Sequence, residues 1–373
     1  MVVPYCVMVV AQSQQTIPLG GGMEGHLAGK GLRYAHVDRQ ATGLIDYEAY
    51  PFTSSDDYVL TLYRRRPLTG TPPRSRPVLF LHGANSNRYC FGVRATSSFT
   101  GYLNRHGFDV WVLEFRGNRS SRYVGKGKPS QNLDAKIQID LPTAIDKVLR
   151  TTGADKLDLI GHSLGGIFIY AYLGANPCAP VGRAITLCSP AHVRRFFGSV
   201  SGALKLPAKV LAPIARRIPG LGVPHLARLR GPLPHLASLA RHIDLQTLTS
   251  GERRDYLDHA VEDMTGGDLA QLMRWFGDGG LATLEGGSYY DVFSRVQHPV
   301  LVMGSAGDRI AEPSAVREAF DRLGCSTKKL LFVGRSFGST RNYSHQDLLL
   351  AGTANQDVFP HARFWLEQHE SLP

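Results

Sequence analysis

Short, mainly apolar runs recur along the chain, separated by segments with helical spacing of apolar positions. Strongly apolar runs of four residues, bounded by polar or turn-forming residues, are typical of strands buried on both faces of a parallel sheet. Two earlier runs, at 47–52 and 58–63, flank a Ser-Ser-Asp-Asp turn and also predict strands. The buried runs lie at residues 78–81, 110–113, 157–160, 184–187, 300–303 and 330–333. The pattern predicts an α/β fold with a mostly parallel sheet and helices on both faces, including helices at 141–151 and 358–368.

One long interruption of this alternation predicts the domain organisation. Between Pro190 and Pro299 no run has the character of a buried strand. We therefore expect an inserted helical cap or lid at residues 193–298 within a single core domain. The core would comprise residues 44–192 and 299–373, and residues 1–43 would form an N-terminal extension.

The distribution of charge adds a hypothesis about the insertion. Residues 193–242 contain nine Lys or Arg and no Asp or Glu, within a formal net charge of +11 for the chain. A basic, apolar segment is suited to peripheral contact with a lipid or polymer surface, or it is a solvated cap whose apolar face lines a pocket. The remaining Arg residues are scattered rather than gathered in one stripe, so no nucleic-acid partner is expected.

Cysteine usage and the first residues bear on the compartment. The cysteines are odd in number and form no CxxC pair and no metal-binding spacing, which favours a reducing, cytoplasmic location over a disulfide framework. The apolar residues 2–11 resemble part of a signal peptide but follow no Lys or Arg, so a secreted or periplasmic location stays open. The sequence does not indicate the oligomeric state of the protein. The cysteines are Cys6, Cys90, Cys178, Cys188 and Cys325.

The pentapeptide Gly161-His162-Ser163-Leu164-Gly165 carries the main chemical signal. It follows the predicted strand 157–160 and precedes a helical run, which is the context that the G-x-S-x-G motif requires. The sharp turn between the two exposes the serine hydroxyl at the carboxyl end of the sheet. Ser163 is therefore the candidate nucleophile, and His162 is expected to be structural.

A serine hydroxyl needs a base, and the base needs an acid. His345 lies in a loop after the last predicted strand and before the closing helix, and Asp308 ends the small-residue turn after strand 300–303. This gives the chain order Ser, Asp, His. The residues after strand 184–187, Cys188-Ser189-Pro190, offer no competing carboxylate.

Two backbone N–H groups are expected to form the oxyanion hole. One belongs to Leu164, the residue after the nucleophile, and the other to Ala84, in the Leu81-His82-Gly83-Ala84 stretch that follows an early strand. Such donors stabilise the negative charge of a tetrahedral intermediate. This chemistry requires no metal and no organic cofactor.

Several further stretches resemble the acid lipase family, which includes lysosomal and gastric lipases and bacterial esterase relatives. The chain departs from the family's eukaryotic members at Leu164, where they have Gln, and in the insertion. Polyhydroxyalkanoate synthases are similar in outline but have Cys at the position of Ser163. The matching stretches are 55–60, 81–83, 107–112, 116–118, 140–146, 161–163, His345 with Asp347, and 358–361.

The resemblance implies an α/β-hydrolase fold and hydrolysis of carboxylic esters that have an apolar acyl part. Its substrate would be a small-molecule or lipid-like ester. Two alternatives use the same triad, namely acyl transfer and hydrolysis of polyester or hydroxyalkanoate esters. A third alternative is a binding protein without catalytic activity on a hydrolase scaffold.

Overall fold

The computed structural model describes residues 43–193, 247–278 and 280–368. Residues 1–42 of the predicted extension, and most of the basic half of the predicted insertion, lie outside the described residues. Everything reported below concerns the unit that begins at Gly43.

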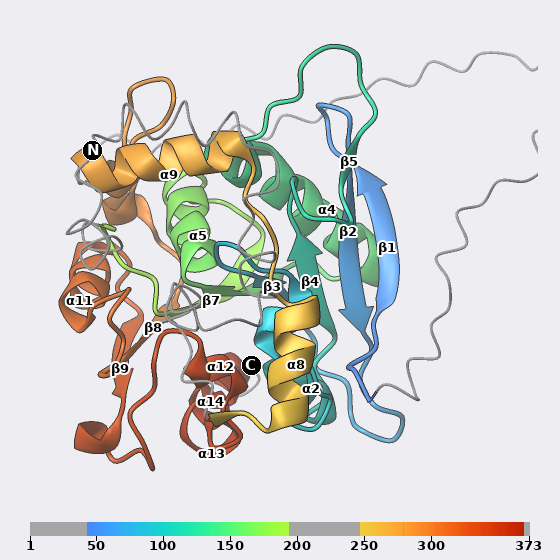
Figure 1. Ribbon diagram of the computed structural model, residues 1–373, viewed down its shortest axis with the longest axis vertical. Helices are drawn as coiled ribbons and strands as arrows, with labels where there is room; N and C mark the ends of the chain where they lie inside the picture. The colour runs from blue at the N-terminus through green and yellow to red at the C-terminus, as the bar shows by residue number, and fades with distance from the viewer. Residues whose placement is uncertain (1–42, 194–246, 279, 369–373) are drawn as a thin grey trace, which may run out of the picture. The chain divides into compact units, whose positions relative to one another are not determined.

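A nine-stranded sheet forms the centre of this unit (Figure 1). Its order is β1-β2-β4-β3-β6-β7-β8-β9, and the short β5 pairs with β2. β1 pairs antiparallel with β2, and β2 with β4 and β5, whereas the other pairs are parallel. The strands are β1 (Glu48–Thr53), β2 (Tyr58–Arg65), β3 (Val78–Leu81), β4 (Val110–Glu114), β5 (Arg122–Tyr123), β6 (Leu157–His162), β7 (Val181–Leu187), β8 (Val300–Ser305) and β9 (Lys328–Val333).

The fold class predicted from the apolar runs is confirmed. Every residue of β3, β4, β6, β7 and β8 is buried, because helices cover both faces of the sheet. α2 (Phe99–Arg105) and α14 (Phe359–Glu367) contact each other on one side, and α4 (Leu141–Thr152) and α5 (Leu164–Ala175) lie on the other (Figure 1). The two-residue strand β5 was not predicted.

Two of the helices that cover the sheet, α4 and α14, begin and end within one residue of the predicted ranges 141–151 and 358–368. α4 (Leu141–Thr152) ends at Gly153, whose φ of 74° is in the left-handed region that favours glycine. α5 (Leu164–Ala175) starts at the residue after Ser163 and is buried along nearly its whole length. Near the other end of the sheet, α11 (Pro313–Arg322) packs on β8 and β9.

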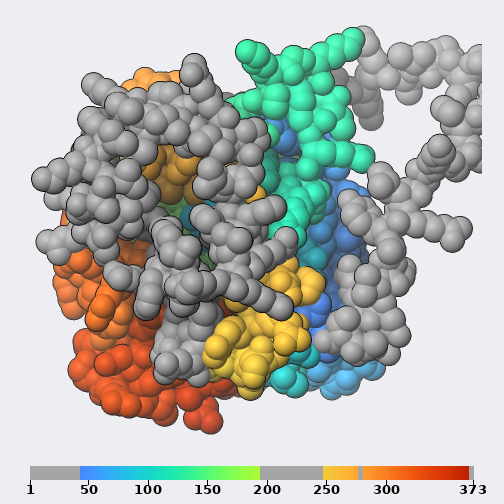
Figure 2. Space-filling model, viewed as in Figure 1, coloured from blue at the N-terminus to red at the C-terminus, as the bar shows by residue number. Residues whose placement is uncertain are grey.

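The segment between β7 and β8 contributes three described helices, α8 (Ser250–His259), α9 (Gly266–Asp278) and α10 (Tyr289–Val292). α8 contacts the 3-10 turn Arg88–Phe91, and it lies on the surface, as the space-filling view shows in yellow (Figure 2). An ion pair between Arg94 and Asp255 joins α8 to the core. The boundaries 193–298 of the predicted insertion stay a prediction.

None of the helices in the described ranges combines the length and the apolar character needed to cross a bilayer.

Candidate active site

Ser163 occupies the turn between β6 and α5 with a strained backbone. Its φ of 54° and ψ of −119° are unusual for a residue with a side chain. The flanking glycines explain how the chain makes this turn. A Cβ on Gly161 would lie 2.6 Å from the backbone of Gly165, and a Cβ on Gly165 would lie 2.2 Å from the carbonyl oxygen of Leu81. The glycines of the pentapeptide therefore let α5 pack directly against the sheet.

Three side chains from separate segments meet at this turn. The hydroxyl of Ser163 lies 2.8 Å from Nε2 of His345, and Nδ1 of His345 lies 2.7 Å from Oδ2 of Asp308. His345 is in the loop after β9, and Asp308 is in the loop after β8. Asp308 and His345 are 3 % and 5 % exposed, whereas Ser163 is partly exposed. The serine hydroxyl is thus the reachable end of a hydrogen-bonded chain whose other members are buried.

The carboxyl of Asp308 is held in its charged form by its surroundings. Burial by itself would raise its pKa, but the charge and hydrogen bond of His345 oppose this effect, as do further hydrogen bonds, and the pKa is lowered below its ordinary range. Oδ1 accepts the backbone N–H groups of Ile310, at 2.8 Å, and Ala311, at 3.1 Å. The second oxygen is left to orient His345.

Cys188 is a neighbour of this carboxyl that sequence reasoning missed. It follows β7 with a φ of 50°, is fully buried, and its thiol hydrogen-bonds to Asp308. Burial raises the pKa of this thiol well above its ordinary value. Sequence analysis considered this position only as a source of a carboxylate. Its place at the carboxyl end of a strand next to β8 was the available signal.

His162 has a structural contact rather than a place in the hydrogen-bonded chain. Its Nε2–H donates to the backbone carbonyl of His345 at 2.9 Å. Ser305 anchors the same loop, since its hydroxyl donates to the carbonyl of Tyr343 at 2.5 Å. Both contacts fix the loop that carries His345.

The two expected oxyanion donors lie beside the nucleophile. A Cβ on Gly83 would be 3.1 Å from Cβ of Ser163, so the loop after β3 runs against the nucleophilic turn. Ala84 follows Gly83 in this loop, and Leu164 is the first residue of α5, where N–H groups have no partner within the helix. Ala84 and Leu164 also line one shared cavity. This arrangement is suited to binding an oxyanion.

Among the described residues, one cluster has the composition of a metal site, formed by Cys188, Asp308 and His345. All three belong to the hydrogen-bonded arrangement just described. A thiol whose pKa is raised by burial stays protonated and is a poor metal ligand. The cluster is thus explained by its own hydrogen bonds, and the expectation of a reaction without a cofactor stays a prediction.

Comparisons with known proteins give relatives named as lipases. The chain is 33 % identical to Lipase member K of Homo sapiens over 143 residues, which are 35 % of this chain and 35 % of that protein. It is 25 % identical to the gastric triacylglycerol lipase of Mus musculus over 384 residues, covering 91 % of this chain and 94 % of the relative. The match spans about a third of the length of the first curated relatives.

A solved structure is similar in fold. A thermophilic esterase from Thermogutta terrifontis superposes with a TM-score of 0.56 at 16 % identity, covering 86 % of this chain and 98 % of that one. A family model described as the alpha/beta hydrolase family matches residues 78–345, which is most of the chain and spans Ser163, Asp308 and His345. The chain therefore belongs to the alpha/beta hydrolase family.

Proposed function

We propose that this protein is a serine carboxylic ester hydrolase, an esterase or lipase that works through an acyl-enzyme on Ser163. The observation that carries the proposal is the hydrogen-bonded chain from Ser163 Oγ through His345 to Asp308. A hydroxyl, an imidazole and a buried carboxylate in this order are the parts that nucleophilic attack on an ester requires. The names of the curated relatives support the same reaction class.

In the first half of the reaction, His345 Nε2 takes the proton of Ser163 as Oγ attacks the ester carbonyl carbon. The carbonyl oxygen becomes an oxyanion that accepts hydrogen bonds from the N–H groups of Ala84 and Leu164. The bond from carbon to the alcohol oxygen then breaks, and the alcohol leaves with the proton held by His345. Asp308 stabilises the charged imidazole and keeps it in the required tautomer.

In the second half, a water molecule gives a proton to His345 and attacks the acyl-enzyme. A second oxyanion forms and collapses, the bond to Ser163 Oγ breaks, and the serine regains its proton. The products are the carboxylic acid and the free enzyme. An acyltransferase would follow the same steps with an alcohol or thiol in place of water, and the two activities are separated by product analysis with and without an acceptor alcohol.

The substrate is proposed to be a small-molecule or lipid-like ester. The wall of the cavity beside the nucleophile includes Phe115, Phe168 and Met264, which are suited to an apolar portion of the acyl group. Peripheral contact with a lipid or polymer surface is proposed for the basic half of the insertion, most of which lies outside the described residues. Rates with p-nitrophenyl esters of increasing chain length, an emulsified triglyceride and a polyester film would rank these substrates.

The decisive test uses a fluorophosphonate probe and p-nitrophenyl butyrate. We expect Ser163→Ala to lose both labelling and turnover while keeping the circular dichroism spectrum of the wild type. Ser189→Ala is the matched control, because Ser189 is a buried serine whose hydroxyl donates to the carbonyl of Leu187, and this variant is expected to be labelled. Unlabelled wild-type protein would instead favour a binding protein on a hydrolase scaffold.

A further inference from the structure

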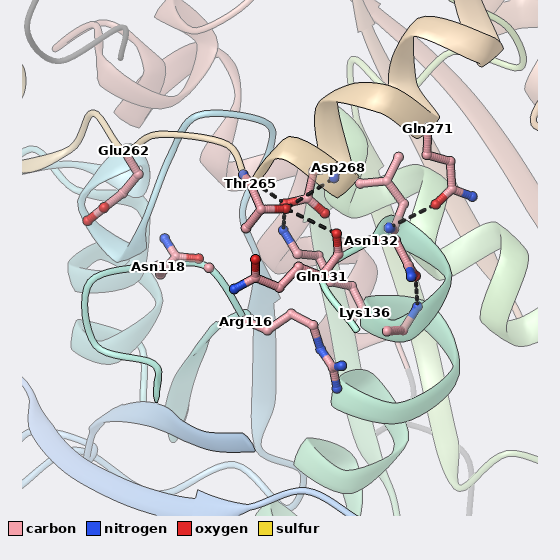
Figure 3. A network of polar contacts seen from close by, with 12 residues as sticks. Arg116, Asn118, Gln131, Asn132, Lys136, Glu262, Thr265, Asp268 and Gln271 are labelled. Carbon is pink, nitrogen blue, oxygen red and sulfur yellow. Dashed lines mark hydrogen bonds and ion pairs between the residues drawn. The ribbon is translucent and has the colours of Figure 1, made fainter. Parts of the chain in front are cut away.

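A cavity beside the oxyanion donors has polar walls that the proposed reaction does not use. It is lined by Ala84 and Leu164 and by His82, Asn118, Lys136 and Asp263. Asp263 belongs to the segment between α8 and α9, and the other five belong to the core. Figure 3 shows this region, with Asp268 and Gln271 on α9 and with Asn118 and Lys136 on the core. The cavity therefore lies where the core and the segment between β7 and β8 meet.

The position of the cavity indicates which part of an ester would enter it. In the proposed reaction His345 protonates the departing alcohol, so the alcohol must lie on the side of His345. No residue from the described part of 299–373 lines the cavity. Because the cavity adjoins the oxyanion donors but not His345, it is placed for the acyl part.

Lys136 supplies hydrogen-bond donors to this space. Its Nζ lies 2.7 Å from Oδ2 of Asp268, and the two side chains are 11 % and 1 % exposed. An ammonium group carries three hydrogens, so the bond to Asp268 leaves donors for a ligand. Asp268 balances the charge of Lys136, and Asp263 adds a negative charge to the wall. The cavity is thus better suited to a neutral polar group than to an anion.

His82 supplies a buried acceptor. Its Nδ1 lies 2.9 Å from the carbonyl oxygen of Gly83, and burial lowers its pKa to about 4. The neutral ring must donate from Nδ1 to that carbonyl, so Nε2 carries a lone pair. Within the described part of the chain, Nε2 is buried and makes no hydrogen bond of ordinary geometry, and its weak contact with the side chain of Asn118 offsets only a small part of the lowering of the pKa. A buried polar atom that lacks a well-formed hydrogen bond is uncommon and costly, which points to a ligand group that completes it.

Helix α9, which carries the partner of Lys136, is closely packed against the core. A Cβ on Gly267, at the start of α9, would lie 1.7 Å from the carbonyl oxygen of Gln131. The side-chain oxygen of Gln271 accepts the backbone N–H of Leu133 at 3.0 Å. These contacts press α9 against the core and keep Asp268, and with it Lys136, in position.

We propose that the cavity binds a hydroxyl group on the acyl part of the ester, with Lys136 donating to the hydroxyl oxygen and His82 Nε2 accepting its hydrogen. A hydroxyl both donates and accepts, which matches the two groups that the walls provide. This inference rests on the proposed ester hydrolysis and names its substrate class as esters of short hydroxy acids.

The test compares p-nitrophenyl esters of butyrate and of each enantiomer of 3-hydroxybutyrate. We expect the wild type to have a kcat/KM at least about tenfold higher for one hydroxy ester than for butyrate, since a buried polar site discriminates against an analogue that cannot complete its hydrogen bonds. A wild type that prefers butyrate overturns the inference. So does one that prefers the p-nitrophenyl hemisuccinate ester, which would make the cavity an anion site. These wild-type results need no variant.

The variant is Lys136→Met with Asp268→Leu, because Lys136→Met alone would leave a buried carboxylate unpaired. Its ratio of hydroxy-ester to butyrate kcat/KM is expected to fall about tenfold. Lys156→Met is the matched control, since it removes an exposed lysine at the opposite end of β6 from Ser163, and its ratio should equal that of the wild type. An unchanged ratio in the double variant contradicts the role of Lys136.

Fluorophosphonate labelling separates the two levels of the argument. Labelled Ser163 without a hydroxy-ester preference overturns the cavity assignment and leaves the proposed function standing. Absence of both labelling and hydrolysis overturns both.

Discussion

The imidazole of His162 donates a hydrogen bond to the backbone carbonyl of His345 across 183 positions of the sequence. The residue before the nucleophile therefore holds the loop of the proposed base. The two rings also contact each other, with centroids 4.7 Å apart.

Replacement of His162 is expected to affect the placement of the base. His162→Ala leaves a buried carbonyl without its donor, which should cost about 1–3 kcal/mol of stability. A small displacement of a catalytic group is costly, so kcat should fall by about ten- to a hundredfold with little change in KM. His162→Gln, which retains an N–H donor, should recover part of the loss. Steady-state kinetics on a p-nitrophenyl ester measures both, and wild-type kcat in the alanine variant would contradict the role.

Asp308→Asn should reduce kcat by about a thousandfold or more while preserving the fold. The amide oxygen can still accept the N–H groups of Ile310 and Ala311, but the charge that stabilises the imidazolium is lost. The lowered pKa keeps Asp308 ionised throughout the neutral range, so the loss should be constant with pH there. Asp347→Asn is the comparison, because Asp347 is also a buried acid near His345 in sequence, and a loss of less than tenfold is expected.

Gly165→Ala tests the close packing of α5 on the sheet. Its Cβ would overlap the carbonyl oxygen of Leu81 at 2.2 Å, so β3 or α5 must shift. Overpacking of this kind costs about 1–3 kcal/mol or more, and the nucleophilic turn should be displaced as well. Gly352→Ala meets no atom within 4 Å and serves as the control. Denaturant unfolding compares the two, and equal stability would show that the turn tolerates a side chain.

His82 should make the protein less stable as the pH falls below neutrality. Its pKa is lowered from 6.5 to about 4 in the folded protein, chiefly by burial. Between these values the unfolded chain binds a proton that the folded chain does not, so stability is present above pH 6.5 and is lost as the pH falls toward 4. The loss from this group between pH 7 and pH 5 is about 2 kcal/mol. His82→Asn should flatten this slope in urea titrations, and identical slopes would refute the assignment.

Much of the fold followed from local pattern. The apolar runs gave six strands, and five of them are fully buried because a strand covered on both faces has few polar positions. The sixth, β9, was expected to be buried but lies at the edge of the sheet and is only partly buried. Gly161 to Gly165 gave the nucleophilic turn because its context was readable on either side. β5 was missed because two residues carry no periodicity. Asp308 and His345 were chosen by their place after strands, and the structure brings both within hydrogen-bond distance of one another. Their catalytic roles stay predictions.

The contacts around this arrangement were not readable in the same way. Cys188, at the end of one strand, meets Asp308 only because β7 and β8 are neighbours in the sheet. Lys136 and Asp268 are 132 positions apart, and their pairing depends on how α9 packs against the core. Such pairs follow from tertiary packing, which local propensity and periodicity do not reveal.

The ion pair between Lys136 and Asp268 has an evolutionary consequence. One bond both shapes the cavity wall and fastens α9 to the core. A single change at either position would alter the ligand preference. The same change would leave the charge of the other residue buried and unpaired. Relatives that diverge here should therefore change both positions in concert, and residues 136 and 268 are expected to covary more strongly than either does with Ser163.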